Sequence, residues 1–442
     1  MSITRRATLG AAVALPVMSA AIRSARAAEP VEIDLFFPVP VQGKLAAEMQ
    51  RLIGEFNQQH PAIKATPVYT GSYDDTNLKT RAAIKAGKPP AAAIMSANFI
   101  REYAIDDAAI PLDPLMEADG VSAEAYMEKF WPALRLNAME QGSVYGVPFQ
   151  NSTPVLYYSV DAFKEAGLDP EHAPGNWQDW LGAMRKLTKA DGSRHGLVMP
   201  STYDYCGWLT SCLVMSNGGQ YYNTDWGGQV YYDDTPSIAA LTFLDNLVRK
   251  HKVMPSGVLD ANACTSAFFG GRAGMMLLST GALGFVTEGM KTPFKTAFVP
   301  GNVLNAAPIG GASLIIPKGN SKERQEAAWT LITWLTSPEI AGGWSRFTGY
   351  FAPNRAAYDL AEMKSYLAEH PNAKVALDQL NRYGRGWFAT YRTVPVRKAM
   401  EDQVQALLAG RVEPAVAAAQ AQKDAEMLLR PYVAQTAMKL PA

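Results

Sequence analysis

The stretch that decides the fold, residues 147–170, reads VPFQNSTPVLYYSVDAFKEAGLDP. Its polar turn at 150–153 leads into an apolar and aromatic run at 155–158, which is typical of a buried strand. A helix follows, and Asp161 is its predicted N-cap. A polar strand that leaves one sheet and passes directly into the first strand and helix of another is the connection that a chain with two lobes requires. The sequence therefore predicts two lobes joined at this point.

The segment before this stretch alternates between strand and helix. Residues 31–36 alternate as a strand does, apolar residues between 45 and 56 have helical spacing, and 63–69 reads as a second strand. A helix over 74–86 ends at Gly87 and two prolines, before a short apolar strand over 91–95. This order predicts an α/β fold in which each lobe holds a mixed, mostly parallel sheet flanked by helices.

Beyond residue 170 the pattern indicates two more crossings. A buried strand is predicted over 272–278, a return to the first lobe near 297–301, and an amphipathic helix over 323–336. We therefore assign 28–150 and 300–335 to lobe 1, and 151–299 and 336–442 to lobe 2. Three crossings would form a hinge that closes without unfolding either lobe.

Residues 1–27 have the pattern of an export signal. Arg5 and Arg6 open a basic region, 9–22 is apolar, and residues 25–27 resemble a cleavage site. The arginine pair resembles a twin-arginine signal, and an ordinary secretory signal is the alternative. No cysteine lies at the cleavage site, so we expect a protein that is free in the periplasm rather than lipid-anchored.

Charge and residue spacing exclude several classes of function. Removal of the signal leaves 37 basic and 41 acidic side chains, a net charge of −4, which argues against a nucleic-acid partner. The three cysteines are predicted to be buried thiols; they are Cys206, Cys212 and Cys264. The five histidines have no metal-ligand spacing, and no G-x-S-x-G motif is present. We therefore expect no metal, no cofactor and no catalytic residue, and a periplasmic phosphodiesterase or other hydrolase is the alternative class.

Three motifs resemble those of one protein family. They are FQNSTPVLYYSVDAF (149–163), IGGASL (309–314) and Thr348-Gly349-Tyr350 followed by Pro353. The chain resembles the periplasmic solute-binding proteins of carbohydrate-type ABC importers, and among them the members that bind glycerol 3-phosphate. The resemblance covers essentially the whole mature chain. It implies a two-lobed periplasmic-binding-protein fold with a three-crossing hinge, a monomer, a small phosphorylated ligand and an ABC permease as partner.

A phosphate ester needs hydrogen-bond donors and one firm positive charge. Ser279 stands at a predicted helix start, where N–H groups and the helix dipole favour an anion, and Arg397 offers a bidentate, charge-assisted contact. Taken alone, each is more simply a cap or a surface charge, and Arg392 is a rival for the anion. The resemblance implies ligand contacts at Tyr73, Ser152, Ser279, Gly311, Tyr350 and Arg397, with Trp208 in an aromatic wall; Ala97, Asn98, Asn151 and Tyr205 are further possible contacts.

One position departs from the family. Ala97 matches a glutamate that binds the glycerol hydroxyls in the relatives, and an alanine cannot accept hydrogen bonds. The expected ligand is therefore a glycerophosphodiester such as glycerophosphocholine, or another phosphorylated polyol, rather than free sn-glycerol 3-phosphate. Trp208 or Tyr205 could stack on a polyol or hold a quaternary ammonium by cation–π attraction. A non-phosphorylated sugar or polyol is the alternative ligand.

Overall fold

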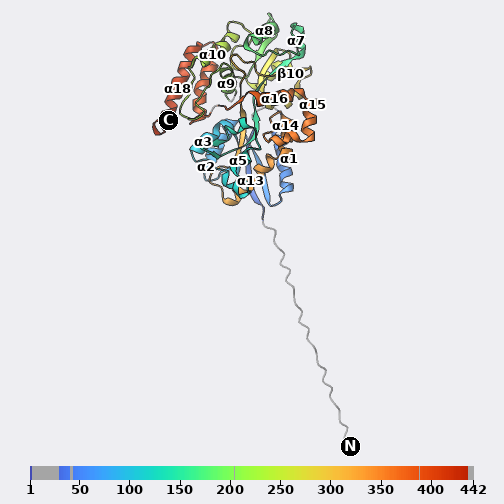
Figure 1. Ribbon diagram of the computed structural model, residues 1–442, viewed down its shortest axis with the longest axis vertical. Coiled ribbons are helices and arrows are strands. Elements are labelled where there is room, and N and C mark those ends of the chain that lie inside the picture. Colours follow the sequence, from blue (N-terminus) through green and yellow to red (C-terminus); the bar gives the residue numbers. More distant parts are fainter. Residues whose placement is uncertain (2–28, 40–42, 204, 388, 437–442) are drawn as a thin grey trace.

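The computed structural model describes residues 1, 29–39, 43–203, 205–387 and 389–436. The predicted export signal lies outside these residues, apart from Met1. The chain forms two lobes, and in Figure 1 the lobe with the blue and cyan N-terminal helices lies below the lobe with the green and red helices. The two-lobed α/β fold predicted from the sequence is confirmed.

The first sheet has five strands in the order β2-β1-β3-β12-β6. Their bounds are β1 Val31–Pro38, β2 Ile63–Gly71, β3 Ala92–Ser96, β6 Val147–Ser152 and β12 Gly310–Ile315. β1 pairs in parallel with β2 and β3, whereas β12 runs antiparallel between β3 and β6. Helices α1 (Leu45–Gln59), α2 (Tyr73–Lys85) and α13 (Lys322–Leu335) pack against this sheet. α1 does so through an apolar stripe that includes Met49, Ile53 and Phe56.

The second sheet has four strands in the order β10-β7-β9-β8. Their bounds are β7 Pro154–Ser159, β8 His195–Val198, β9 Ala273–Ser279 and β10 Phe294–Ala297. Only β8 and β9 pair in parallel, so the prediction of a mostly parallel sheet is wrong for this lobe. The reason lies at the crossing: β7 starts at the hinge straight after β6, whereas β9 ends there, with Pro154 opposite Ser279.

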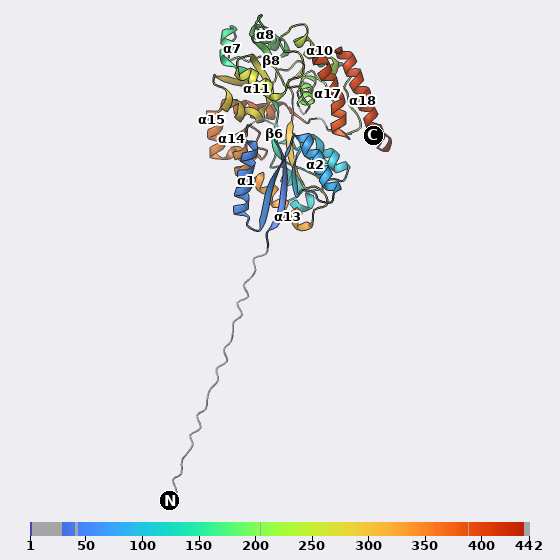
Figure 2. The same ribbon diagram turned by 180° about the vertical axis from the view of Figure 1, so that it is seen from behind.

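Helices cover the second sheet and complete its core. They include α9 (Cys206–Ser216), which is buried along its whole length, α10 (Thr235–Val248), α17 (Thr393–Leu408) and α18 (Pro414–Gln435). α17 and α18 lie side by side at the edge of this lobe (Figure 2). The three cysteines are buried and free, as predicted. No helix in the described ranges has the length and apolar character to cross a membrane.

Three connections between the lobes form the hinge. The chain leaves the first sheet at Thr153, returns between β10 and β12, and crosses again between α14 (Pro338–Thr348) and α17. Hydrogen bonds tie these segments together, because Phe351 N donates to Asn151 O at 2.9 Å and β11 (Ala307–Pro308) pairs with β13 (Gly384–Arg385). The crossings therefore lie next to one another beside the ends of both sheets.

Two local details bear on the sequence predictions. Ser159, not Asp161, caps helix α7 (Val160–Glu165), because its Oγ accepts from Ala162 N at 3.2 Å while Asp161 lies in the first turn. Trp344 of α14 stacks on Phe149 of β6 at 5.4 Å between ring centroids, within the core of the first lobe. The lobe boundaries stay a prediction, and this contact favours moving the last of them beyond α14.

Candidate ligand-binding site

A small pocket of about 40 Å³ lies where the hinge meets the ends of both sheets. It brings together the seven predicted contact residues and Tyr205. The lining residues are Tyr73, Ser96, Ser152, Tyr205, Trp208, Ser279, Gly310, Gly311, Tyr350, Trp387 and Arg397. Side chains from both lobes and from the connections between them therefore converge on one place.

Strand ends supply most of the polar lining. Ser96 ends β3 and Ser152 ends β6, in the first sheet, while Ser279 ends β9 in the second. Tyr73 is the first residue of α2, directly after β2 and its capping residue Ser72. Ligands of open α/β sheets bind outside the carboxyl ends of the strands, and these side chains lie at such ends.

Two glycines at the start of β12 permit close packing beneath the pocket. Gly311 has φ +88°, and a Cβ there would lie 1.9 Å from the carbonyl oxygen of Gln150. A Cβ on Gly310 would lie 2.7 Å from Cε2 of the Trp208 indole. No other residue type fits at either position without a shift of its neighbours.

Two phenols meet in the pocket. Tyr73 Oη accepts a hydrogen bond from Gln150 Nε2 at 3.0 Å. Tyr350 lies over Gly281, where a Cβ would come within 2.5 Å of its ring. Burial raises the pKa of Tyr350 well above its ordinary value, and the neighbouring Tyr73 adds to this shift. The Tyr350 phenol therefore stays protonated and keeps a proton to donate.

Ser279 is anchored at the end of β9. Its Oγ accepts from Gly281 N at 3.1 Å, and Tyr157 Oη donates to its carbonyl oxygen at 2.7 Å. The element that it caps is a single 3₁₀ turn, η2 (Thr280–Ala282), followed by the short helix α12 (Leu283–Gly289). Ser279 therefore stands at the start of a helical segment, as the sequence predicts, and its role as an anion contact stays a prediction.

Arg397 on α17 is buried and already paired. Its Nη2 donates to both carboxylate oxygens of Asp74, at 3.1 and 2.8 Å, and its Nε donates to Glu401 at 3.3 Å. Asp74 lies on α2, so this ion pair links the two lobes. Burial raises the pKa of Glu401 even though Arg397 opposes the shift. The sequence predicted a bidentate contact from Arg397 to an anion, and in the structure this guanidinium lies between the carboxyl groups of Asp74 and Glu401.

Arg392, the predicted rival for the anion, is exposed and does not line the pocket. It lies just before α17, where it forms the N-cap position in a left-handed backbone conformation at φ 56°. Arg397 is therefore the arginine that the fold brings to the pocket.

Two tryptophans wall the pocket. Trp208 donates from Nε1 to the carbonyl oxygen of Pro308 at 3.1 Å, so its N–H is used on the hinge. Trp387 is 5% exposed, and its Nε1 has no hydrogen-bond partner within the described chain. Its backbone is clamped by Asn137, which accepts from Trp387 N at 3.2 Å and donates to Trp387 O at 3.1 Å. The sequence did not predict Trp387 as a site residue. The one feature that could have indicated it is an aromatic residue directly after a glycine in a segment between two helices.

Three of the further possible contacts lie outside the pocket. Ala97 lines a larger neighbouring cavity. The buried amide of Asn98 makes no hydrogen bond within the described residues, and Asn151 donates to Gly310 O at 3.4 Å. Across the part of the chain that the structure describes, no cluster of three or more His, Cys, Asp or Glu side chains could hold a metal ion.

Comparison with known proteins gives the family. Residues 42–342 match the family model described as bacterial extracellular solute-binding protein. The chain belongs to this family. The predicted class of protein, a solute-binding protein of an importer, is therefore confirmed.

Relatives in this family align over almost the whole chain. The sn-glycerol-3-phosphate-binding periplasmic protein UgpB of Yersinia pseudotuberculosis is 28% identical, with 89% of this chain and 91% of the relative covered. UgpB of an Escherichia coli O6 strain is 27% identical, with 90% and 92% covered. The periplasmic location predicted from the sequence agrees with both.

Solved structures confirm the fold. UgpB of Mycobacterium tuberculosis in complex with glycerophosphocholine superposes with a TM-score of 0.80 at 24% identity, covering 91% of this chain and 99% of that one. Maltose-bound MalE3 of Thermotoga maritima gives 0.78 at 24% identity, covering 90% and 100%. Both are two-lobed binding proteins, so the fold is shared by proteins with different ligands.

Proposed function

We propose that this protein captures a phosphorylated glycerol derivative between its lobes and delivers it to the transmembrane subunits of an ABC importer. The ligand is a glycerophosphodiester such as glycerophosphocholine, or sn-glycerol 3-phosphate. One observation carries the proposal: the seven residues that the family resemblance implies as ligand contacts, on both lobes and the hinge, line a single pocket. The names of the curated relatives support the same ligand class.

The lining suits a phosphate ester because it combines neutral hydroxyl donors with one guanidinium. Hydroxyls of Ser152 and Ser279, the phenols of Tyr73 and Tyr350, and the guanidinium of Arg397 all border the pocket. Closure of the lobes removes water from such a site, and each charge-assisted contact is stronger where the dielectric constant is lower. An anion held there would contact groups from both lobes at once, which favours the closed state.

The pairing of Arg397 shapes how an anion would bind. A phosphate oxygen that takes the Nη2 donor must displace the Asp74 carboxylate, which is 32% exposed and able to turn toward solvent. Ligand binding would then exchange one link between the lobes for another. The carboxylate of Asp74 thus takes the Arg397 Nη2 donor that we assign to the anionic group of the ligand.

We further propose that the protein is a monomeric carrier and not an enzyme. The family supports the role of a carrier, because its members are named for solute binding. Incubation with glycerophosphodiesters, followed by assays for released phosphate and alcohol, tests it. Turnover above a buffer control would instead favour the periplasmic hydrolase.

Titration calorimetry on refolded, ligand-free protein tests the ligand class. The panel is sn-glycerol 3-phosphate, glycerophosphocholine, maltose and ribitol. We expect binding of at least one phosphorylated compound and none of the two neutral ones. Binding of maltose or ribitol alone would reject the proposal and favour a sugar or polyol carrier.

A further inference from the structure

A second cavity of about 460 Å³ adjoins the small pocket to which we assign the phosphate group, which we call the phosphate pocket. The two cavities are lined by consecutive residues at two places: Ser96 and Trp387 border the small pocket, and their neighbours Ala97 and Gly386 border the large one. At about 40 Å³ the small pocket is far below the range of about 300–1,000 Å³ usual for ligand sites, which the large cavity meets. We call this larger cavity the side chamber.

Ala97 lies where the lining of the side chamber meets that of the small pocket, because the preceding residue Ser96 borders the small pocket. Ala97 lines the side chamber, and a longer side chain at this position would project into the space beside the phosphate pocket. Alanine, with its single methyl group, takes up little of that space. The substituent of a phosphodiester can therefore extend from the pocket into the side chamber.

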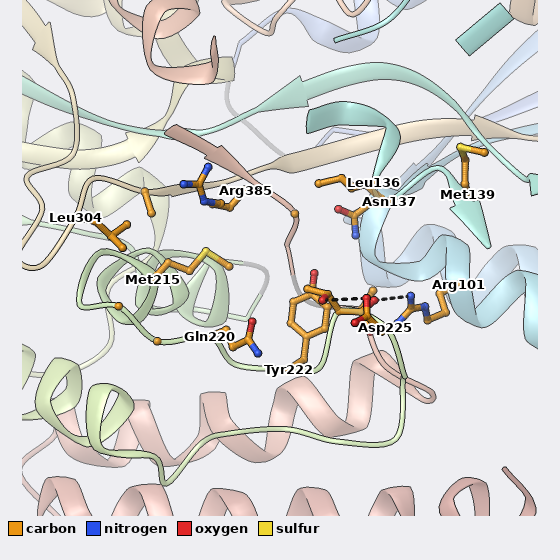
Figure 3. A pocket seen from close by; sticks show the side chains of 17 residues that line it. Arg101, Leu136, Asn137, Met139, Met215, Gln220, Tyr222, Asp225, Leu304 and Arg385 are labelled. Carbon is orange, nitrogen blue, oxygen red and sulfur yellow. Dashed lines mark hydrogen bonds between the residues drawn. The ribbon is translucent and has the colours of Figure 1, made fainter. Parts of the chain in front are cut away.

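Three polar side chains of the side chamber are open to a ligand. Arg385 makes one hydrogen bond within the described chain, to the carbonyl oxygen of Gly384 at 3.3 Å. Within the described residues, the carboxylate of the exposed Asp225 accepts a hydrogen bond only from its neighbour Thr224, at 3.4 Å, and the exposed Gln220 makes none. Figure 3 shows Asp225 close to Arg101 on one side of the cavity and Arg385 on the opposite side.

The other charged group of the side chamber is already satisfied. Arg101 donates to Glu140 at 2.8 Å, to Thr224 O at 3.0 Å and to Ala389 O at 3.4 Å. The charge of Arg101 is therefore compensated by Glu140, so this side chain lines the cavity but is not available to bind an anion. The available groups are thus one guanidinium, one carboxylate and one amide.

This combination selects hydroxyl groups. A second phosphate group would be repelled by the carboxylate of Asp225. A quaternary ammonium would be repelled by Arg385 and would find no aromatic cage, because Tyr222 is the one aromatic side chain among the described lining residues. A hydroxyl both donates and accepts, so it satisfies all three side chains. We propose that the side chamber binds the hydroxyl-rich alcohol of a glycerophosphodiester, such as an inositol, and so favours polyol diesters over the choline ester. This inference rests on the proposed function.

Calorimetry with glycerophosphoinositol, glycerophosphocholine and sn-glycerol 3-phosphate tests the inference on the full-length mature protein. We expect Asp225→Asn and Arg385→Gln each to weaken glycerophosphoinositol about tenfold, the effect of losing a hydrogen bond to a charged group, and to change glycerol 3-phosphate less than about twofold. Matched controls are Asp233→Asn and Arg430→Gln, which make the same charge changes at exposed positions outside both cavities. Ala97→Glu should weaken binding of the inositol diester, while binding of glycerol 3-phosphate should be unchanged or tighter.

Each other outcome has a distinct meaning. If the wild type binds phosphorylated glycerols but the chamber variants alter no ligand, or alter all of them alike, the side chamber is not a subsite. If Asp225→Asn weakens only the choline ester, the chamber recognises a cation and the polyol inference is wrong. If the wild type binds none of the three compounds, the proposed function fails with it.

Discussion

Asp74→Asn should tighten the binding of a phosphorylated ligand. The substitution removes the carboxylate that holds Arg397 Nη2 at 2.8 and 3.1 Å and that a phosphate must displace. Two unit charges at about 4 Å attract by about 4 kcal/mol at an effective dielectric constant of about 20. Because 32% of the Asp74 side chain is exposed, solvent screening reduces the net value to about 1 kcal/mol. Release of that amount corresponds to about fivefold tighter binding.

Calorimetry on the refolded variant measures this change, with Asp75→Asn as its control. Asp75 carries the same charge one residue later but accepts from Ser72 N at 2.9 Å, within a capping box, and not from Arg397. The control should lower the free energy of unfolding through the lost cap and change ligand affinity less than about twofold. Equal or weaker binding by Asp74→Asn would show that the Arg397 guanidinium does not receive the anion.

Three further changes probe the pocket and the surface. Trp387→Phe removes an indole N–H that has no partner within the described residues, so ligand affinity measured by calorimetry should fall about three- to tenfold. Urea denaturation should show a small decrease in the free energy of unfolding from lost packing. Unchanged affinity would show that this N–H does not contact the ligand. Ser279→Ala should cost about 1–3 kcal/mol of binding, and a smaller loss would mean that Ser279 is only a cap. Lys189 and Arg194 lower the pKa of Glu165 to about 2, so its ion pairs stabilise the fold above its ordinary pKa of 4.5 and are lost as the pH falls toward 2. The melting-temperature gap between wild type and Glu165→Gln should therefore close over that range, and a gap independent of pH would contradict this.

The parts of the site that depend on local sequence could be predicted. A polar residue at the end of an apolar strand predicts the position of Ser279, and a glycine pair before an apolar run predicts a close backbone approach at Gly311; their role in the site came from the family resemblance. The first crossing between the lobes could be predicted because a single residue, Thr153, separates a polar strand from an apolar one. Each of these features is encoded within a few residues of the chain.

The parts that depend on distant contacts could not be predicted. Asp74 and Arg397 are 323 residues apart, and nothing in either local sequence indicates that the fold pairs them. The direction of each strand in the second sheet depends on the end of the sheet at which the chain enters it, and the periodicity of apolar residues carries no information about this. Trp387 lies in a short irregular segment, so its place in the pocket follows from its contacts with Asn137.

The most direct test is a crystal structure of the refolded protein with a glycerophosphodiester. We expect the phosphorus atom in the pocket between the lobes, with its oxygens within hydrogen-bond distance of Ser279 Oγ, Tyr350 Oη and the Arg397 guanidinium, and with Asp74 turned away. A ligand bound elsewhere, with Arg397 still paired to Asp74, would contradict the assignment of this pocket.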